Sequence, residues 1–176
     1  MNRSDTVLIT GPSCCGKTYI LLHELPEKEY RMHFDFILIF SPNLLFNSIY
    51  STRKYLDTDT DVIALHIRTG RLNTMLQHIT YVYTASRTAV VIADMSDSNE
   101  QHNNHNALSH LGYSGRYHNF TLFILSQKVN WIATGLRGNT TRVMYFTTHN
   151  RRSEAILKDE FLGSLTRKRN QRSLRN

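Results

Sequence analysis

A glycine-bounded loop near the start of the chain has the residue types and spacing of a phosphate-binding site. Residues 11–18 read GPSCCGKT, which matches the pattern G-x-x-x-x-G-K-[ST]. Glycine lets the backbone wrap closely around phosphate oxygens, and successive backbone N–H groups form a nest for an anion. In such a loop Lys17 reaches the β- and γ-phosphates, while the hydroxyl of Thr18 is a ligand for Mg²⁺. The pattern therefore predicts a site for a nucleoside triphosphate and Mg²⁺.

The other members of this loop are expected to bind through their backbones. The predicted nucleotide-binding residues are Gly11, Pro12, Ser13, Cys14, Cys15, Gly16, Lys17 and Thr18. Cys14 and Cys15 occupy variable positions of the pattern, so we interpret them as small filler. Adjacent cysteines form no disulfide framework and lack metal-ligand spacing. The alternative is a redox-sensing thiol, because Lys17 and a helix N-terminus lie nearby.

Carboxylates are the second requirement of a triphosphate-hydrolysing site, and they follow a neighbouring strand. The segment VVIADMSDS places Asp94 at the end of an apolar run and Asp97 shortly after it. Asp94 is the candidate ligand for Mg²⁺, with Asp97 or Glu100 orienting the attacking water. Alternatively, Asp94 orients the water and Ala93 has replaced its partner acid, which predicts weak hydrolysis.

An amide and several arginines complete the candidate catalytic residues. Gln127 ends the apolar run FTLFILSQ, where an amide senses the γ-phosphate or aligns water by hydrogen bonding. Arg116, in GRYHN, and Arg137, in GLRGN, are candidates for an arginine finger that acts on a neighbouring subunit's γ-phosphate. Arg142 is a further candidate for that role.

Apolar runs alternate with amphipathic segments along the chain, and these elements must position the candidate residues. Buried strands are expected at 6–10, 34–41, 88–94, 120–127 and 142–148, and 62–67 is either a strand or the entry to a helix. Helices are expected at 17–25, 71–87, 106–113 and 153–163. This alternation predicts an α/β fold with a mostly parallel central sheet and helices on both faces.

Length and charge limit the function classes. The 176 residues, 40% of them apolar, are typical of one globular domain, which we expect over 1–163. No apolar run of about 18 residues is present, so no membrane span is expected. The start MNRSDTVLIT lacks a secretory signal, which predicts an intracellular protein. The segment 164–176 contains five of the seven surplus positive charges and is expected to be a flexible tail. Either it contacts nucleic-acid phosphates or directs the protein to the nucleus, or it is merely solvated.

The linked motifs resemble those of the poxvirus-type genome-packaging ATPases of the FtsK–HerA superfamily. The resemblance runs over about residues 5–148 and rests on the order GPSCCGKT, ILIFSPN, VVIADMSDS, GRYHNFTLFILSQ and LRGNT. It implies a RecA-like (ASCE) P-loop fold in which the glutamine strand lies between the P-loop strand and the aspartate strand. The positions that match the family are Lys17 and Thr18 for phosphate and Mg²⁺, Asp94 for the acid strand, Gln127 for the sensor, and Arg116 and Arg137 for its recurrent arginines.

The same resemblance implies Mg²⁺-dependent ATP hydrolysis by a homo-oligomeric ring, a pentamer or hexamer. Such a ring pumps double-stranded DNA into a preformed capsid and docks on a capsid portal or vertex protein. It implies a location inside a virus-infected host cell, in a viral factory or the nucleus, or association with the virion. The family usually has paired acids where this chain has Ala93, Asp94 and Met95.

Two other classes of function remain as alternatives. The pattern GPSxxGK[ST] also occurs in nucleoside and nucleotide kinases, which usually need an arginine-rich lid. No clear R-x-x-x-R sequence lies between Asp94 and Gln127. The single acid at the strand end favours instead a nucleotide-binding assembly protein with weak hydrolysis.

Overall fold

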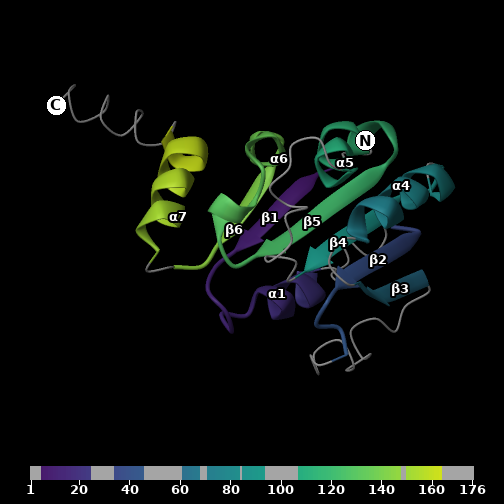
Figure 1. Cartoon of the computed structure of the whole chain (residues 1–176), viewed down its shortest axis with the longest axis horizontal. Coiled ribbons are helices and arrows are strands. Elements are labelled where there is room, and N and C mark those ends of the chain that lie inside the picture. Colours follow the sequence, from purple (N-terminus) through teal and green to yellow (C-terminus); the bar gives the residue numbers. More distant parts are fainter. Residues whose placement is uncertain are drawn as a thin grey trace.

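Six parallel strands form one sheet in the computed structural model, which describes residues 5–24, 34–45, 61–67, 71–83, 85–93, 107–147 and 150–163. The strands are β1 (Thr6–Thr10), β2 (Phe36–Ser41), β3 (Asp61–His66), β4 (Thr88–Ala93), β5 (Phe120–Ser126) and β6 (Arg142–Tyr145). Their order is β3-β2-β4-β5-β1-β6, and every neighbouring pair is parallel (Figure 1).

The strand that leads to Gln127 lies between the P-loop strand and the strand that leads to the predicted acids. In register, Ser126 of β5 pairs with Thr10 of β1, and Leu125 pairs with Ala93 of β4. Parallel strands bring their carboxyl ends to one edge of a sheet, which is where open α/β folds bind ligands. The order implied by the family resemblance is therefore present, and it places the ends of β1, β4 and β5 together.

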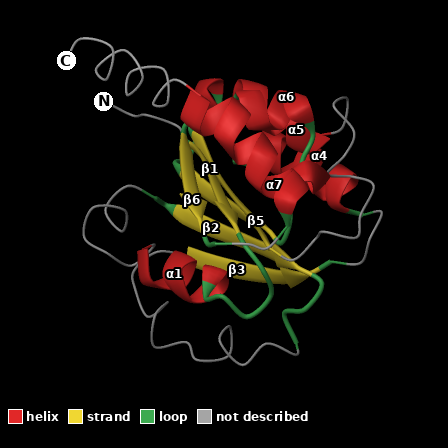
Figure 2. Ribbon diagram, turned by 90° about the vertical axis from the view of Figure 1, so that its left-hand side faces the viewer, coloured by secondary structure: helices red, strands yellow, loops and turns green. Residues whose placement is uncertain are grey.

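Alternate residues of the strands face two separate apolar layers, because side chains along a strand point to opposite faces. On one face pack α4 (Leu72–Val82), α5 (Ala107–Ser114) and α6 (Thr134–Gly138), and on the other packs α1 (Lys17–Glu24) (Figure 2). The first layer includes Leu8, Phe40, Ile92, Leu122, Ile124, Leu76, Leu108 and Leu136, and the second includes Val7, Ile9, Ile39, Val91, Phe123, Leu125, Leu21 and Leu22. The predicted α/β sheet with helices on both faces is confirmed.

The C-terminal helix lies on the same side of the sheet as α4, α5 and α6 (Figure 2). It begins as α7 (Arg151–Ile156), where the side chain of Asn150 accepts hydrogen bonds from the N–H groups of Arg152 and Ser153. That cap explains why the helix starts before the predicted residue 153. It continues as η5 (Leu157–Leu162), six residues in π-helical conformation that the sequence did not indicate.

Several predicted boundaries differ from the structure for local reasons. The helix predicted at 71–87 ends at Val82, and the N–H of Arg87 donates to the carboxylate of Asp35 at 2.9 Å rather than to a helical carbonyl. The strand predicted at 142–148 ends at Tyr145, opposite Thr10, where β1 itself ends. The segment 62–67 is a strand, Asp61–His66, rather than a helix entry.

Arg87 and Asp35 also form an exposed ion pair where β2 and β4 begin. The guanidinium donates to both carboxylate oxygens of Asp35, with the shorter contact at 2.8 Å. These hydrogen bonds lower the pKa of the Asp35 carboxyl below its ordinary value. Within the described residues, no helix is long and apolar enough to cross a membrane.

Candidate nucleotide-binding site

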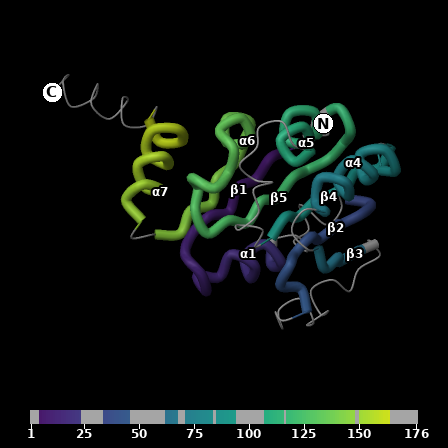
Figure 3. Tube along the Cα trace, in the orientation of Figure 1, coloured from purple at the N-terminus to yellow at the C-terminus, as the bar shows by residue number. Residues whose placement is uncertain are grey.

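The predicted phosphate-binding loop joins the end of β1 to the start of α1, at the carboxyl edge of the sheet (Figure 3). The N–H of Gly11 donates to the carbonyl of Ser126 at 3.2 Å, so the first loop residue is tied to the end of β5. At the other end, the N–H of Ile20 donates to the carbonyl of Gly16 at 2.9 Å, which starts the helix inside the loop. Both ends of the loop are therefore fixed by backbone hydrogen bonds.

The two glycines of the motif are required for different physical reasons. A Cβ on Gly11 would lie 2.5 Å from Cβ of Phe146 and 3.0 Å from Sγ of Cys15, so no side chain fits there. Gly16 has open space around it but a φ of +95°, a conformation that side-chain-bearing residues rarely adopt. The first glycine thus permits close packing, and the second permits the turn into α1.

Lys17 carries the charge of the site and is 5% exposed. Its Nζ donates to the carbonyls of Gly11 at 3.0 Å and Pro12 at 2.7 Å, and it lies 3.8 Å from Sγ of Cys15. None of these three partners is a carboxylate, so none of them offsets the positive charge of the lysine beside the N-terminus of α1. Backbone N–H groups, a helix N-terminus and a lysine together favour binding of an anion with the charge of a polyphosphate.

The outer part of the loop faces solvent. Pro12, Ser13, Cys14 and Gly16 are exposed, whereas Cys15 and Thr18 are half-buried. Cys14 has a φ of +59°, in the left-handed region that costs an L-residue about 1–2 kcal/mol. The loop is thus held in a conformation that suits glycine better than cysteine.

This backbone conformation gives a prediction for the thiol. Cys14→Gly is expected to retain nucleotide affinity, whereas Cys14→Val should weaken it and lower the free energy of unfolding by about 1–3 kcal/mol, because a β-branched residue resists a positive φ. Titration with a fluorescent ATP analogue and thermal unfolding measure the two effects. Equal loss of affinity in both variants would mean that the sulfur itself takes part in binding.

Gln127 follows Ser126, the last residue of β5. The backbone of Ser126 is bonded to the first residue of the loop. The hydroxyl of Ser126 donates to the carbonyl of Lys128 at 2.9 Å and accepts from its N–H at 3.4 Å, which fixes the turn around Gln127. The carbonyl of Ser126 meanwhile holds Gly11. The side chain of Gln127 is half-buried. The structure thus brings the backbone next to Gln127 and the phosphate-binding loop together, and the sensor role of the amide stays a prediction.

The candidate arginines lie in three different places. Arg116 belongs to η3 (Gly115–Tyr117), before β5, and the seven-residue strand separates it by about 20 Å from the loop edge of its own sheet. Arg142 starts β6, and its Nη2 lies 3.0 Å from the carboxylate of Asp5. Arg137 lies on α6 and is bonded inside the chain to Glu160.

The described residues include only part of the predicted site, and they add one charged residue that the sequence did not indicate. Asp94, Asp97, Glu100 and the tail 164–176 lie outside the described residues. Glu160, the partner of Arg137, was not singled out from the sequence, because an acid on an amphipathic helix normally faces solvent.

The comparisons with known proteins bear on the fold. No protein-family model and no curated protein matches the chain. In structure it is similar to the genome packaging NTPase B204 from Sulfolobus turreted icosahedral virus 2 in complex with ATP-gammaS, with a TM-score of 0.71 and 15% identity over 92% of this chain and 84% of that one. The fold is that of a RecA-like P-loop NTPase.

Further solved structures share this fold. The same NTPase in complex with AMP matches with a TM-score of 0.70 and 14% identity, over 96% of this chain and 87% of that chain. The N-terminal domain of zonular occludens toxin from Neisseria meningitidis matches with a TM-score of 0.55 and 14% identity, over 84% of this chain and 79% of that chain. At such identities the likeness is one of architecture.

Proposed function

We propose that this chain is the ATP-hydrolysing subunit of a motor that packages double-stranded viral DNA into a capsid. The observation that carries the proposal is the position of β5 between β1 and β4, with Gly11 bonded to Ser126 directly before Gln127. From this arrangement we expect one γ-phosphate to be within reach of both Lys17 and the amide of Gln127. The similarity in fold to a viral genome packaging NTPase supports the same assignment.

Each group of residues in the site has its own role in hydrolysis. The N–H groups of the loop bind the phosphates, and Lys17 exchanges the carbonyls of Gly11 and Pro12 for the β- and γ-phosphate oxygens. Gln127 aligns the attacking water by hydrogen bonding. Mg²⁺, bound with the triphosphate, neutralises the charge that develops on the phosphates.

The metal ion needs oxygen ligands, and the loop offers one. Thr18 is half-buried at the N-terminus of α1, directly after Lys17, so its hydroxyl is the ligand the loop supplies. We assign Asp94 as the second protein ligand, and Asp97 or Glu100 as the acid that orients water. The loop is thus suited to a magnesium–triphosphate complex.

The proposed partners follow from the motor role. A homo-oligomeric ring, a pentamer or hexamer, places an arginine of one subunit at the phosphates of the next, and we assign that task to Arg116. The ring acts on double-stranded DNA, docks on a portal or vertex protein of the capsid, and works inside an infected cell. The basic tail 164–176 contacts DNA phosphates.

The test is the rate of ATP hydrolysis with and without double-stranded DNA, at protein concentrations below and above oligomerisation. We expect slow turnover by monomers, faster turnover by oligomers, and a further increase with DNA. Nucleotide binding without turnover under every condition would indicate an assembly protein instead. Transfer of the γ-phosphate to an added nucleoside would indicate a kinase.

A further inference from the structure

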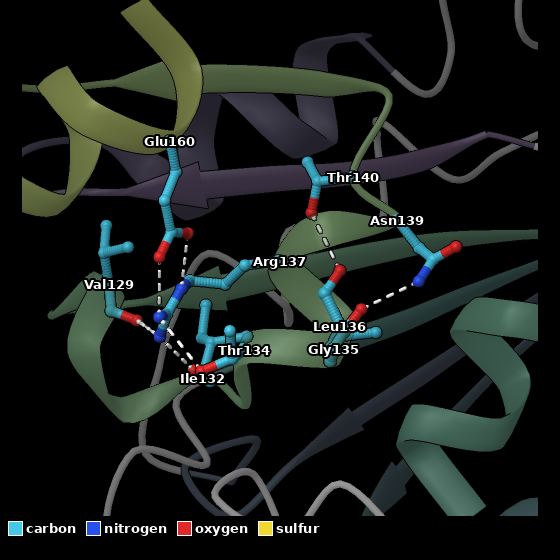
Figure 4. Close-up of polar contacts among 9 residues, drawn as sticks. All are labelled: Val129, Ile132, Thr134, Gly135, Leu136, Arg137, Asn139, Thr140 and Glu160. Atoms are coloured by element: carbon cyan, nitrogen blue, oxygen red, sulfur yellow. Dashed lines mark hydrogen bonds and ion pairs between the residues drawn. The ribbon is translucent and has the colours of Figure 1, made fainter. Parts of the chain in front are cut away.

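The guanidinium of Arg137 is fully occupied within its own chain. The residue is 9% exposed, and its Nε and Nη2 donate to the two carboxylate oxygens of Glu160 at 2.8 and 2.9 Å (Figure 4). Nη1 donates to the carbonyls of Ile132 at 2.6 Å and Val129 at 3.5 Å. Nη2 also donates to the hydroxyl of Thr134 at 3.3 Å. All five N–H donors of an arginine therefore have acceptors.

This arrangement suits an arginine that holds its own subunit together. A finger acting on a neighbour must present free N–H donors to phosphate oxygens. Arg137 would have to give up five hydrogen bonds to do so, and it would leave Glu160 without its partner. Removing Glu160 from this bidentate ion pair would leave the buried guanidinium without its carboxylate, which is destabilising.

The acceptors show what Arg137 holds in place. Val129 and Ile132 belong to the segment that begins directly after Gln127 and contains η4 (Val129–Trp131). Their carbonyls both accept hydrogen bonds from the guanidinium of Arg137, which ties η4 to α6. The crossover from β5 to β6 is thus shaped by one buried cation.

The C-terminal helix contacts the crossover from β5 to β6 at two places, Arg137 and Asn130. Glu160 lies in the π-helical η5, a rare conformation that often marks functional positions. One turn from the start of α7, the hydroxyl of Ser153 lies 3.5 Å from Oδ1 of Asn130 in η4, and Ser153 is 4% exposed. The helix is therefore fastened at both ends to the residues that follow the predicted sensor.

We propose that Arg137 and Glu160 are positioning residues for the proposed ATPase. Their ion pair locks the segment after Gln127 to the C-terminal helix, and so sets where the amide of Gln127 stands relative to the γ-phosphate. The inference rests on the proposed function for its catalytic consequence. It removes Arg137 from the trans-acting role.

The first test compares Glu160→Gln and Arg137→Lys with the matched control Glu154→Gln. Glu160→Gln keeps the shape of the side chain but removes its charge, and Arg137→Lys keeps the charge but removes the bidentate geometry. Glu154 lies on the same helix, and its carboxylate pairs with the exposed Lys158 at 2.7 Å. We expect kcat to fall by about 10- to 100-fold in both test variants, since small misplacements of a catalytic group have such effects. KM and nucleotide affinity should change little, and Glu154→Gln should match the wild type.

A double-mutant cycle tests whether the pair acts through Gln127. If it does, Glu160→Gln should lower kcat far less in a Gln127→Ala background than in the wild type, because the two changes remove the same contribution. Additive losses would overturn the positioning role. Unchanged or faster turnover in Glu160→Gln, together with inactive Arg137→Lys, would restore Arg137 as a finger and also overturn the inference.

A third measurement does not depend on hydrolysis. Trp131 is the single tryptophan of the chain, and it lies in η4 with Nζ of Lys128 4.3 Å from its ring centroid. Acrylamide should quench its fluorescence more strongly in Glu160→Gln and Arg137→Lys than in Glu154→Gln or the wild type. If the wild type hydrolyses no ATP but quenching is still stronger in Glu160→Gln and Arg137→Lys, the coupling is supported and the proposed function is overturned. Identical quenching in all four proteins would overturn the coupling.

Discussion

Replacing Lys17 with alanine is expected to reduce ATP turnover by at least about 100- to 1,000-fold, the effect of removing one preorganised charge-stabilising group. Lys17 is buried in the loop, and among the described residues its Nζ bonds the carbonyls of Gly11 and Pro12 and the sulfur of Cys15. No carboxylate among these partners is left unpaired by the change. We therefore expect a large loss of turnover together with only a small decrease in the free energy of unfolding.

Phosphate release by the oligomeric protein, with saturating ATP, measures this effect. Lys158→Ala is the matched control, because Lys158 is an exposed lysine that pairs with Glu154 far along the chain from the loop. Equal turnover by Lys17→Ala and the wild type would refute the assignment of the loop as the hydrolytic site.

Gly11→Ala is expected to weaken nucleotide binding by more than about tenfold and to lower the free energy of unfolding by about 1–3 kcal/mol, the usual cost of overpacking. The added Cβ would stand 2.5 Å from Cβ of Phe146, which cannot swing away as the end of a long side chain can. Relief of that clash must displace either the loop or β6. Titration with a fluorescent ATP analogue and chemical denaturation measure both quantities.

The matched control is Gly138→Ala. Gly138 ends α6, and a Cβ added there meets no heavy atom within 4 Å. Alanine at this position should leave nucleotide affinity and stability close to those of the wild type. If Gly11→Ala were equally harmless, the contact between the loop and Phe146 would not constrain the site.

The strands and the phosphate-binding loop could be predicted because local sequence determines them. Apolar runs such as TVLIT and FTLFILS are buried along their whole length, as expected for strands covered on both faces. The loop motif has fixed spacing, and each glycine has a local reason. Gln127 could be placed because strand ends in a parallel sheet share one edge.

The remaining features depend on contacts between distant segments. Arg137 was one of three arginines considered as a finger, and its bonding to Glu160, 23 residues further on, could not be read from the local sequence. Arg87 lies beyond the end of α4 and pairs with Asp35, 52 residues earlier. Short elements such as α6, with five residues, are below the length at which hydrophobic periodicity can be recognised.

The sheet also has a mechanical consequence. The helix that follows the nucleotide loop, α1, lies on one face, whereas α4, α5, α6 and α7 lie on the other. A close-packed sheet is stiff and compresses little, so it separates the two layers of helices. In the proposed motor, we expect force from the loop to pass around the carboxyl edge of the sheet, where the described residues include the hydrogen bond from Gly11 to Ser126. If the chain acts as the proposed motor, a change at the loop would move the other layer through that edge.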